Sequence, residues 1–270
     1  MNVNAHADPE AGALAPYYLP SGGEVALFEQ CHARQLAVML KGPTGCGKTR
    51  FVEYMAWRLG RPLITISCHD DLSASDLVGR FLIGPDGTEW HDGPLTSAVR
   101  EGAICYLDEV VEARQDTVVV LHPLSDHRRM LPIDKTGEML LAAPGFQLVV
   151  SYNPGYQRML KDMKPSTRQR FVALDFAFPP PEQETAIVER EGGAAYSLAH
   201  ALVTLGHRLR ALHDRGLAEV PSTRLLIAAA RLVSSGIAVH QACYAAIIGP
   251  LSDEPALVAA MRDLVDASFV

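Results

Sequence analysis

The sequence predicts an α/β domain built on a buried parallel sheet, followed by a smaller domain made only of helices. Three observations predict this: short apolar runs recur along the first two thirds of the chain, segments long enough for crossover helices separate them, and helical periodicity dominates after about residue 180. Apolar runs of this kind are typical of strands that are buried on both faces. Strands that alternate with helices favour a parallel sheet, because parallel neighbours need a crossover connection.

Five apolar runs are the expected strands and predict a five-stranded sheet. They are LAVMLK (36–41), LITIS (63–67), AICYLDE (103–109), FQLVVSY (146–152) and FVALDF (171–176). Two further segments do not fit a plain crossover, and we expect hairpin insertions near 80–90 (RFLIGPDGTEW) and 129–145 (RMLPIDKTGEMLLAAPG). A hairpin is too short to form its own core, so the apolar residues of the first one either pack on their own domain or present apolar surface to a partner. These residues are Phe81, Leu82, Ile83 and Trp90.

The C-terminal part is predicted to be an all-helical lid domain. Leucines at three- and four-residue steps mark one amphipathic helix that should stop at Gly216; they are Leu198, Leu202, Leu205, Leu209 and Leu212. The segments at 221–236 and 253–269 carry similar start and stop signals. The expected organisation is therefore a flexible tail at 1–16, an α/β domain at 17–180 and a helical domain at 181–270.

Composition limits the classes of function. With 270 residues, of which 48% are hydrophobic and 20% charged, the chain is globular. Its net charge of −7 argues against a general nucleic-acid surface, because nonspecific affinity comes from basic residues that neutralise phosphates. A basic run lacks the aromatic interleaving of single-strand binders; it comprises Lys161, Lys164, Arg168 and Arg170. Five scattered cysteines, no leader pattern and no membrane-spanning apolar run predict a soluble cytoplasmic protein with reduced thiols and no membrane insertion.

A glycine-rich stretch, LKGPTGCGKTRF, separates the first apolar run from a helical segment. In such a context backbone N–H groups surround phosphate oxygens, a lysine reaches the β- and γ-phosphates, and a threonine hydroxyl ligates Mg²⁺. The stretch therefore predicts a loop that binds a nucleoside triphosphate, in preference to a glycine-rich turn that binds nothing. It supplies G-x-x-x-x-G-K-T as Gly42, Pro43, Thr44, Gly45, Cys46, Gly47, Lys48 and Thr49.

The third apolar run ends in two carboxylates, Asp108 and Glu109. The first is placed to hold the Mg²⁺ shell and the second to polarise an attacking water, which favours hydrolysis. The alternative is an acidic strand end that only caps a helix or forms a surface salt bridge. The chain contains no N-K-x-D motif of the kind that a G protein uses for guanine. The segment CHDD (68–71) is expected to be a loop before a helix and not a metal site, because adjacent donors on an extended chain point in alternating directions.

These motifs resemble the MoxR family of AAA+ ATPases, and within it the CbbQ/NirQ/NorQ group. The resemblance covers roughly residues 17–235, through LKGPTGCGKTRF, CHDDLSASDLVGR, DGPLT, GAICYLDEVVEARQDT, HPLSDHRR, VVSYNPGYQ and MKPSTRQRF. It implies a P-loop NTPase fold of the AAA+ type, with ATP and Mg²⁺ as cofactors. It also implies a homohexameric ring, in which the two hairpins match the helix-2 insert and the pre-sensor-1 hairpin that face the central pore.

The resemblance also implies roles for residues that are uninformative alone. Asn153 matches sensor 1, which helps to position the lytic water. Arg170 matches the arginine finger that reaches the nucleotide of the neighbouring subunit, with Arg168 as a second candidate, and Arg224 on the helical domain matches sensor 2. One departure concerns the finger: the family pattern places aspartate immediately before it, and Gln169 stands there in this chain.

Members of the group activate other enzymes together with a separate partner that carries a von Willebrand factor A domain, a CbbO- or NorD-like protein. The resemblance implies a Rubisco-activating motor, which the stretches LITISCHDDLSASDLVGRFLI and HRRMLPIDKTGE favour. An activator of nitric oxide reductase maturation is the alternative. A small-molecule P-loop kinase is a more remote one, because such a kinase would not need a sensor-1 asparagine, an arginine finger or a second arginine on a helical domain.

Overall fold

A computed structural model of the protein describes residues 15–85, 87–154, 163–212 and 219–269. The chain forms two compact units that divide between Phe176 and Ala177, with the loop residues Thr44–Gly47 grouped with the second unit. Most of the expected tail, Lys161 of the basic run and Gly216 lie outside the described residues. No helix in the described ranges is long and apolar enough to cross a membrane.

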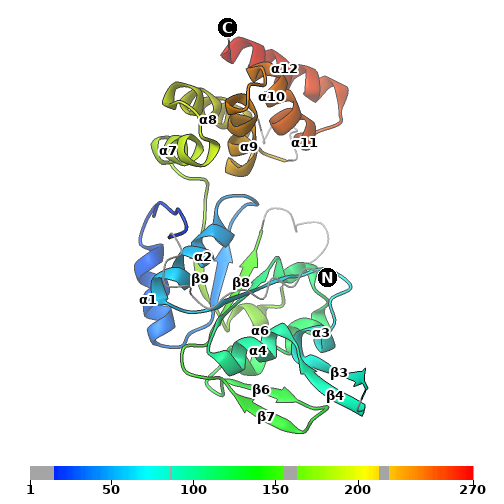
Figure 1. Ribbon diagram of the computed structural model, residues 1–270. Coiled ribbons are helices and arrows are strands. Elements are labelled where there is room, and N and C mark those ends of the chain that lie inside the picture. The colour runs from blue at the N-terminus through cyan, green and yellow to red at the C-terminus, as the bar shows by residue number, and fades with distance from the viewer. Residues whose placement is uncertain (1–14, 86, 155–162, 213–218, 270) are drawn as a thin grey trace. The chain divides into compact units, whose positions relative to one another are not determined.

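A five-stranded parallel sheet forms the centre of the first unit (Figure 1). The strand order is β2-β5-β8-β1-β9, and every neighbouring pair is parallel. All five expected strands are present, which confirms the predicted fold class. The strands are β1 (Val38–Lys41), β2 (Leu63–Ser67), β5 (Ile104–Asp108), β8 (Gln147–Tyr152) and β9 (Val172–Asp175).

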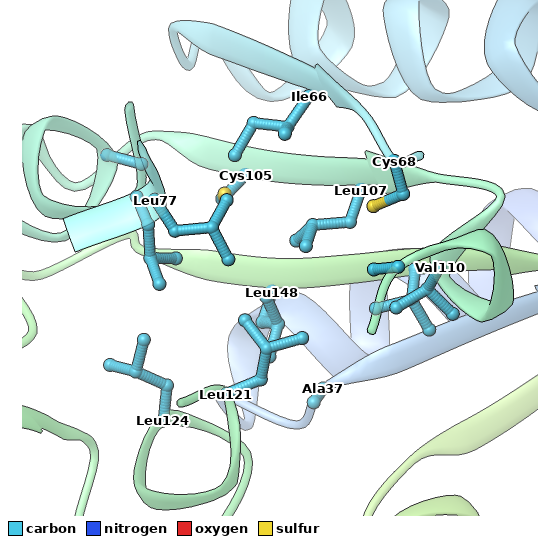
Figure 2. Close-up of a cluster of buried hydrophobic side chains, with 14 of the residues drawn as sticks. Ala37, Ile66, Cys68, Leu77, Cys105, Leu107, Val110, Leu121, Leu124 and Leu148 are labelled. Atoms are coloured by element: carbon cyan, nitrogen blue, oxygen red, sulfur yellow. The ribbon is translucent and has the colours of Figure 1, made fainter. Parts of the chain in front are cut away.

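Alternation of side chains along these strands divides the core into two layers. In β5, Tyr106 faces the layer that contains α1 and α2, whereas Cys105 and Leu107 face the opposite layer. Figure 1 shows α1 and α2 on one side of the sheet and α3 and α4 on the other. Figure 2 shows the second layer, in which the apolar side chains of β2, β5 and β8 meet those of the segments that follow β5. The helices are α1 (Glu24–Ala33), α2 (Lys48–Leu59), α3 (Ala74–Val78) and α4 (Pro94–Glu101).

Both expected hairpins are present as separate two-stranded antiparallel sheets. In the first, the Trp90 ring packs edge-on against Phe81 with 5.2 Å between ring centroids, and its indole N–H donates to Asp92. Ile83, near the turn of the same hairpin, is 92% exposed. Trp90 therefore packs on its own domain, whereas Ile83 presents apolar surface. The hairpins are β3 (Gly79–Gly84) with β4 (Gly87–Asp92), and β6 (Met130–Ile133) with β7 (Glu138–Leu141).

Short helical pieces complete the first unit. The turn η1 follows β5, and α5 and η2 carry the chain toward the second hairpin. The helix α6 precedes β9, the last strand of the sheet. Their bounds are η1 (Val110–Glu112), α5 (Gln115–Val119), η2 (His122–Leu124) and α6 (Pro165–Arg168).

The described part of the second unit contains helices and no strand. Leu202, Leu205 and Leu209 of the leucine stripe are fully buried in its core. The helix that carries them ends at Arg210, and the expected stop at Gly216 lies outside the described residues. The Arg210 side chain donates to Glu184 and to the Pro221 carbonyl oxygen. The helices are α7 (Pro181–Gly192), α8 (Tyr196–Arg210), α9 (Thr223–Ser234), α10 (Val239–Cys243), a π-helical turn (Tyr244–Ile248), α11 (Gly249–Leu251) and α12 (Pro255–Ser268).

Candidate nucleotide-binding site

The glycine-rich loop connects β1 to α2, and its glycines are required by its geometry. A Cβ atom at Gly42 would lie 2.3 Å from the carbonyl oxygen of Phe176, too close for any side chain. Gly45 and Gly47 have φ angles of +72° and +102°, in the left-handed region that favours glycine. The chain can therefore turn directly into α2, whose first N–H groups have no partner inside the helix. Such a helix start, together with its dipole, is an anion-binding site.

Lys48 is the first residue of α2 and its side chain is held within the loop. Only 8% of the residue is exposed, and Nζ donates to the carbonyl oxygens of Gly42 and Pro43, both at 2.8 Å. A buried ammonium requires partners, and these two carbonyls provide them. Hydrogen bonds to a charged phosphate oxygen are stronger than those to a neutral carbonyl. The position of Lys48 therefore fits a polyphosphate ligand.

Asp108 ends β5 on the face of the sheet that α2 covers. Residues 106 and 108 share one face of the strand, so the carboxylate lies near the first turn of α2, where Thr49 Oγ1 is 3.5 Å from Asp108 Oδ2. Adjacent oxygens in the octahedral shell of Mg²⁺ are about 3 Å apart, since the metal–oxygen distance is about 2.1 Å. This pair of hard oxygen donors therefore fits a divalent metal of that size.

Glu109 follows Asp108 in a conformation that is rare for residues other than glycine. Its φ and ψ angles are 55° and 49°, and the residue is exposed. Backbone outliers of this kind persist where the surrounding structure holds them, and they cluster at functional sites. The turn separates the roles of the two neighbouring carboxylates, because Asp108 faces Thr49 while Glu109 stays accessible to solvent.

Ser151 and Tyr106, two residues that sequence reasoning missed, fix the Asp108 carboxylate, and Ser151 also holds the Glu109 backbone. Ser151 Oγ donates to Asp108 Oδ1 at 2.5 Å and accepts the Glu109 N–H at 2.7 Å, and Tyr106 Oη donates to the same Oδ1 at 2.7 Å. Because Oδ1 accepts both hydroxyls, Oδ2 is left to face Thr49. Burial and the nearby charge of Asp108 raise the pKa of Tyr106 far above its ordinary value, so the phenol remains a donor.

Strand pairing explains why Ser151 meets Asp108. The register of β5 and β8 places Tyr106 opposite Val149, so the residues two positions further along, Asp108 and Ser151, also face each other. The signal in the sequence is a serine two residues after buried Val149, and so on the same face of a mostly apolar strand. It becomes informative only once β5 and β8 are known to be neighbours.

Cys68 lies beside the carboxylates without taking part in their chemistry. Its N–H donates to the Asp108 carbonyl oxygen at 3.0 Å. Burial, reinforced by the charges of Asp108 and Glu109, raises the pKa of the thiol to about 12. The thiol therefore stays protonated at neutral pH and is a poor nucleophile and a poor metal ligand. The CHDD segment leads into α3, where Ser73 and Asp76 form a capping box.

The other predicted residues lie in three places. Asn153 directly follows β8 at the carboxyl edge of the sheet, where Tyr152 pairs with the last residue of β1 and its carbonyl accepts the Gly42 N–H. Arg168 and Arg170 precede β9 at the opposite, amino edge. β1 lies beside β9 in register and has four residues, so its length of about 13 Å separates Arg170 from the loop of its own chain. Arg224 is an exposed residue in the first turn of α9, in the second unit.

Both halves of the chain match known families. Residues 37–171 match the model of the AAA domain (dynein-related subfamily), and residues 184–268 match that of the CbbQ/NirQ/NorQ C-terminal region. The denitrification regulatory protein NirQ of Stutzerimonas stutzeri is 61% identical over 271 residues, which cover 100% of this chain and 98% of that protein. The chain belongs to the CbbQ/NirQ/NorQ family. It joins an AAA domain to the C-terminal region that is typical of this family.

Other relatives and a solved structure agree with this assignment. Protein NorQ of Paracoccus denitrificans is 58% identical, covering 99% of this chain and 100% of that protein. Protein CbbQ of Hydrogenophilus thermoluteolus is 57% identical, covering 94% and 95%. The P216G mutant of Thermotoga maritima RuvB has a TM-score of 0.55 at 14% identity, covering 90% of this chain and 68% of that chain, and shows the shared fold alone. This AAA+ fold implies nucleotide binding with a divalent metal.

For this family member we expect Ser151→Ala to raise the Mg²⁺ concentration needed for half-maximal ATP hydrolysis by about 10-fold, because Asp108 loses a donor that turns Oδ2 toward Thr49. It should also lower kcat, since the Glu109 N–H loses its acceptor. Tyr106→Phe removes a donor from Asp108 and a 3.5 Å contact with Thr49 but leaves the Glu109 N–H its acceptor, so it should raise the Mg²⁺ requirement with a smaller effect on kcat. A Mg²⁺ titration at saturating ATP measures both, and unchanged values in Ser151→Ala would show that the contact has no such role.

Proposed function

We propose that this chain is a Mg²⁺-dependent ATPase that uses hydrolysis to remodel and so activate a client enzyme. The observation that carries the proposal is the arrangement at the carboxyl edge of the sheet, where Lys48 and Thr49 begin α2, Asp108 ends β5 and Glu109 follows it. This arrangement has the parts that phosphoryl transfer to water needs: a phosphate cradle, metal ligands and an exposed carboxylate.

Each residue has a role that follows from its position. Lys48 binds the β- and γ-phosphates, and Thr49 with Asp108 orients the metal side of the nucleotide. Glu109 accepts the proton of the attacking water, and Asn153 at the end of β8 helps to position that water. Bound Mg²⁺ supplies charge neutralisation at the phosphates.

The amino-edge arginines suggest that a second subunit completes the site. Arg170 lies about 13 Å along β1 from the loop of its own chain, which favours its use at a neighbour's nucleotide. There the guanidinium would stabilise the charge that spreads over the transferred phosphoryl group. The proposal therefore includes a homohexameric ring, with Arg168 as the second finger candidate and Arg224 of the helical unit as sensor 2.

The client is proposed to be an enzyme of denitrification, with nitric oxide reductase as the specific candidate. The relatives named NirQ and NorQ are 61% and 58% identical, against 57% for CbbQ. The order of these identities does not favour the Rubisco client that the sequence stretches suggested. A partner with a von Willebrand factor A domain is part of either proposal.

Gene deletion in the source organism, followed by complementation, tests the client. We expect nitric oxide consumption to fall and to be restored by the wild-type gene but not by the Glu109→Gln gene. If nitric oxide consumption is unaffected while the purified protein and its partner reactivate inhibited Rubisco with ATP, the client is Rubisco and the ATPase proposal stands. Phosphate transfer to a small acceptor by a monomer, without release of inorganic phosphate, would instead identify a kinase.

The exposed tip of the first hairpin provides a prediction about client contact. Ile83→Ser should leave basal ATP hydrolysis within about 2-fold, because the residue is 92% exposed and outside the site, yet impair client activation. The matched variant Trp90→Ala should instead lower the melting temperature, since Trp90 packs on Phe81 and the core. Full client activation by Ile83→Ser would show that this surface is not used.

A further inference from the structure

Arg170 is held by a carboxylate from a distant part of the chain. Its Nη1 donates to Asp126 Oδ2 at 2.7 Å, across 44 residues of sequence, and lies 3.4 Å from the His122 carbonyl oxygen. The expected aspartate immediately before the arginine is absent, because Gln169 stands there. Asp126, in the HPLSDHRR segment, thus supplies the carboxylate from another element.

The segment that carries Asp126 is fixed at both ends. Before it, Leu121 and Leu124 are buried in the same cluster as the side chains of β5 and β8 (Figure 2). After it, Arg129 donates to the carbonyl oxygens of Gln35 and Phe146 at 3.0 and 2.9 Å. The base that supports the long Arg170 side chain is therefore rigid.

A further contact ties this base to the helix that leads into Arg170. His122 Nε2 lies 3.0 Å from the Thr167 hydroxyl, which is buried in α6 three residues before Arg170. The backbone from which the guanidinium extends and the carboxylate that holds it are thus packed against each other. Their relative position does not depend on the ion pair alone.

The ion pair between Asp126 and Arg170 orients the guanidinium and still allows it to move to another partner. Arg128 already pairs with both oxygens of Asp126, at 3.0 and 2.7 Å, so the carboxylate keeps a partner when Arg170 moves away. The Arg128 guanidinium holds the pKa of Asp126 well below its usual range, which keeps the charge in place at physiological pH. Arg170 Nε is buried and has no hydrogen-bond partner among the described residues, whereas 32% of the side chain as a whole is exposed. These contacts therefore leave part of the guanidinium available for a further hydrogen-bond acceptor.

We propose that Asp126 is the positioning residue of the arginine finger: its carboxylate holds the Arg170 guanidinium ready for the phosphates bound by a neighbouring subunit. An arginine loses much rotamer freedom when it binds, so a preset orientation lowers the cost of engagement. The inference rests on the proposed function, in which Arg170 acts in trans. It adds that Asp126 matters only in the subunit that donates the finger.

Mixed rings test this directly. Glu109→Gln subunits keep the finger but lack the base, and Arg170→Ala subunits keep the base but lack the finger, so rings of both should regain ATP hydrolysis. Asp126→Asn is then placed either in the Glu109→Gln subunit, which donates the finger, or in the Arg170→Ala subunit, which does not. We expect at least a 5-fold loss of the regained activity in the first placement and less than a 2-fold loss in the second.

Comparison of the two placements separates positioning from folding, because a defect in folding or assembly would reduce both. Equal losses, or no loss in the donor placement, would overturn the role of Asp126. A gain in the donor placement would also overturn it, by showing that Asp126 restrains the finger. The matched control is Asp116→Asn, which changes another arginine-paired surface aspartate and should leave both mixtures unchanged. If the mixture of Glu109→Gln and Arg170→Ala subunits regains no activity although mixed rings form, the proposal that Arg170 acts in trans is itself wrong. The role of Asp126, which depends on it, is then also overturned.

Discussion

Glu109→Gln is expected to bind ATP with wild-type affinity and to lower kcat by about 10²–10⁴-fold, because the amide cannot accept the proton of the attacking water. Asp108 should keep its position, since Ser151 holds it through Asp108 Oδ1 and the Glu109 backbone N–H, which the substitution leaves unchanged. Binding of a fluorescent nucleotide and release of inorganic phosphate measure the two quantities separately.

The matched variant Lys48→Ala should show the opposite pattern in binding. It removes the ammonium that faces the phosphates in the ground state, so nucleotide affinity itself should fall. Wild-type turnover in Glu109→Gln would exclude this glutamate as the base. Wild-type affinity in Lys48→Ala would contradict the assignment of the phosphate-binding loop.

Arg210→Ala is expected to destabilise the helical unit by about 3–5 kcal/mol, because it removes the guanidinium that pairs with both oxygens of a buried carboxylate and leaves only His207 Nε2, 3.2 Å away, as a basic neighbour. Glu184 is fully buried, and both of its oxygens accept from Arg210 at 2.7 Å, while the Thr223 hydroxyl donates to one of them at 2.6 Å. Arg210 Nε also donates to the Pro221 carbonyl oxygen, so the network fixes the start of α9. Arg224, the sensor-2 candidate, follows Thr223 directly.

Urea unfolding followed by circular dichroism measures this change. Arg208→Ala is the matched control, because this arginine lies two residues away on the same helix and is exposed, with a 3.4 Å contact to the Ser268 hydroxyl. Its effect should stay within about 0.5 kcal/mol. Replacing both Glu184 and Arg210 by apolar residues should recover part of the loss. A change below about 1 kcal/mol in Arg210→Ala would show that the ion pair does not hold the unit together.

The sheet could be predicted from the sequence because each of its strands is a short apolar run. The hairpins could be predicted because residues typical of turns separate their two strands. The loop residues from Gly42 to Thr49 could be predicted because they are contiguous. Their pattern carries its own chemistry and does not depend on which strands are neighbours.

The support of the site could not be predicted in the same way, because it joins residues that are distant in sequence. In the sequence, Ser151 is only a polar residue in a buried strand. Its contact with Asp108 becomes apparent once β8 is known to lie beside β5. Asp126 and Arg170 are 44 residues apart, and their pairing depends on how the segment after β5 packs under the sheet. Glu184 breaks the expectation that glutamates lie on the surface, because its partner Arg210 is on the next helix.

The central claim is that hydrolysis occurs at a site shared by two subunits, with Arg170 supplied in trans. The most direct measurement is the ATPase activity of a titrated mixture of Arg170→Ala and Glu109→Gln subunits, each nearly inactive alone, with mixed assembly verified by mass. One complete site forms at each interface where a Glu109→Gln subunit supplies Arg170 to the nucleotide of an Arg170→Ala subunit, which keeps Glu109. Activity should therefore rise to a maximum at an intermediate ratio. Activity that stays at the level of the separate variants in verified mixed rings, or full activity of Arg170→Ala alone, would contradict the claim.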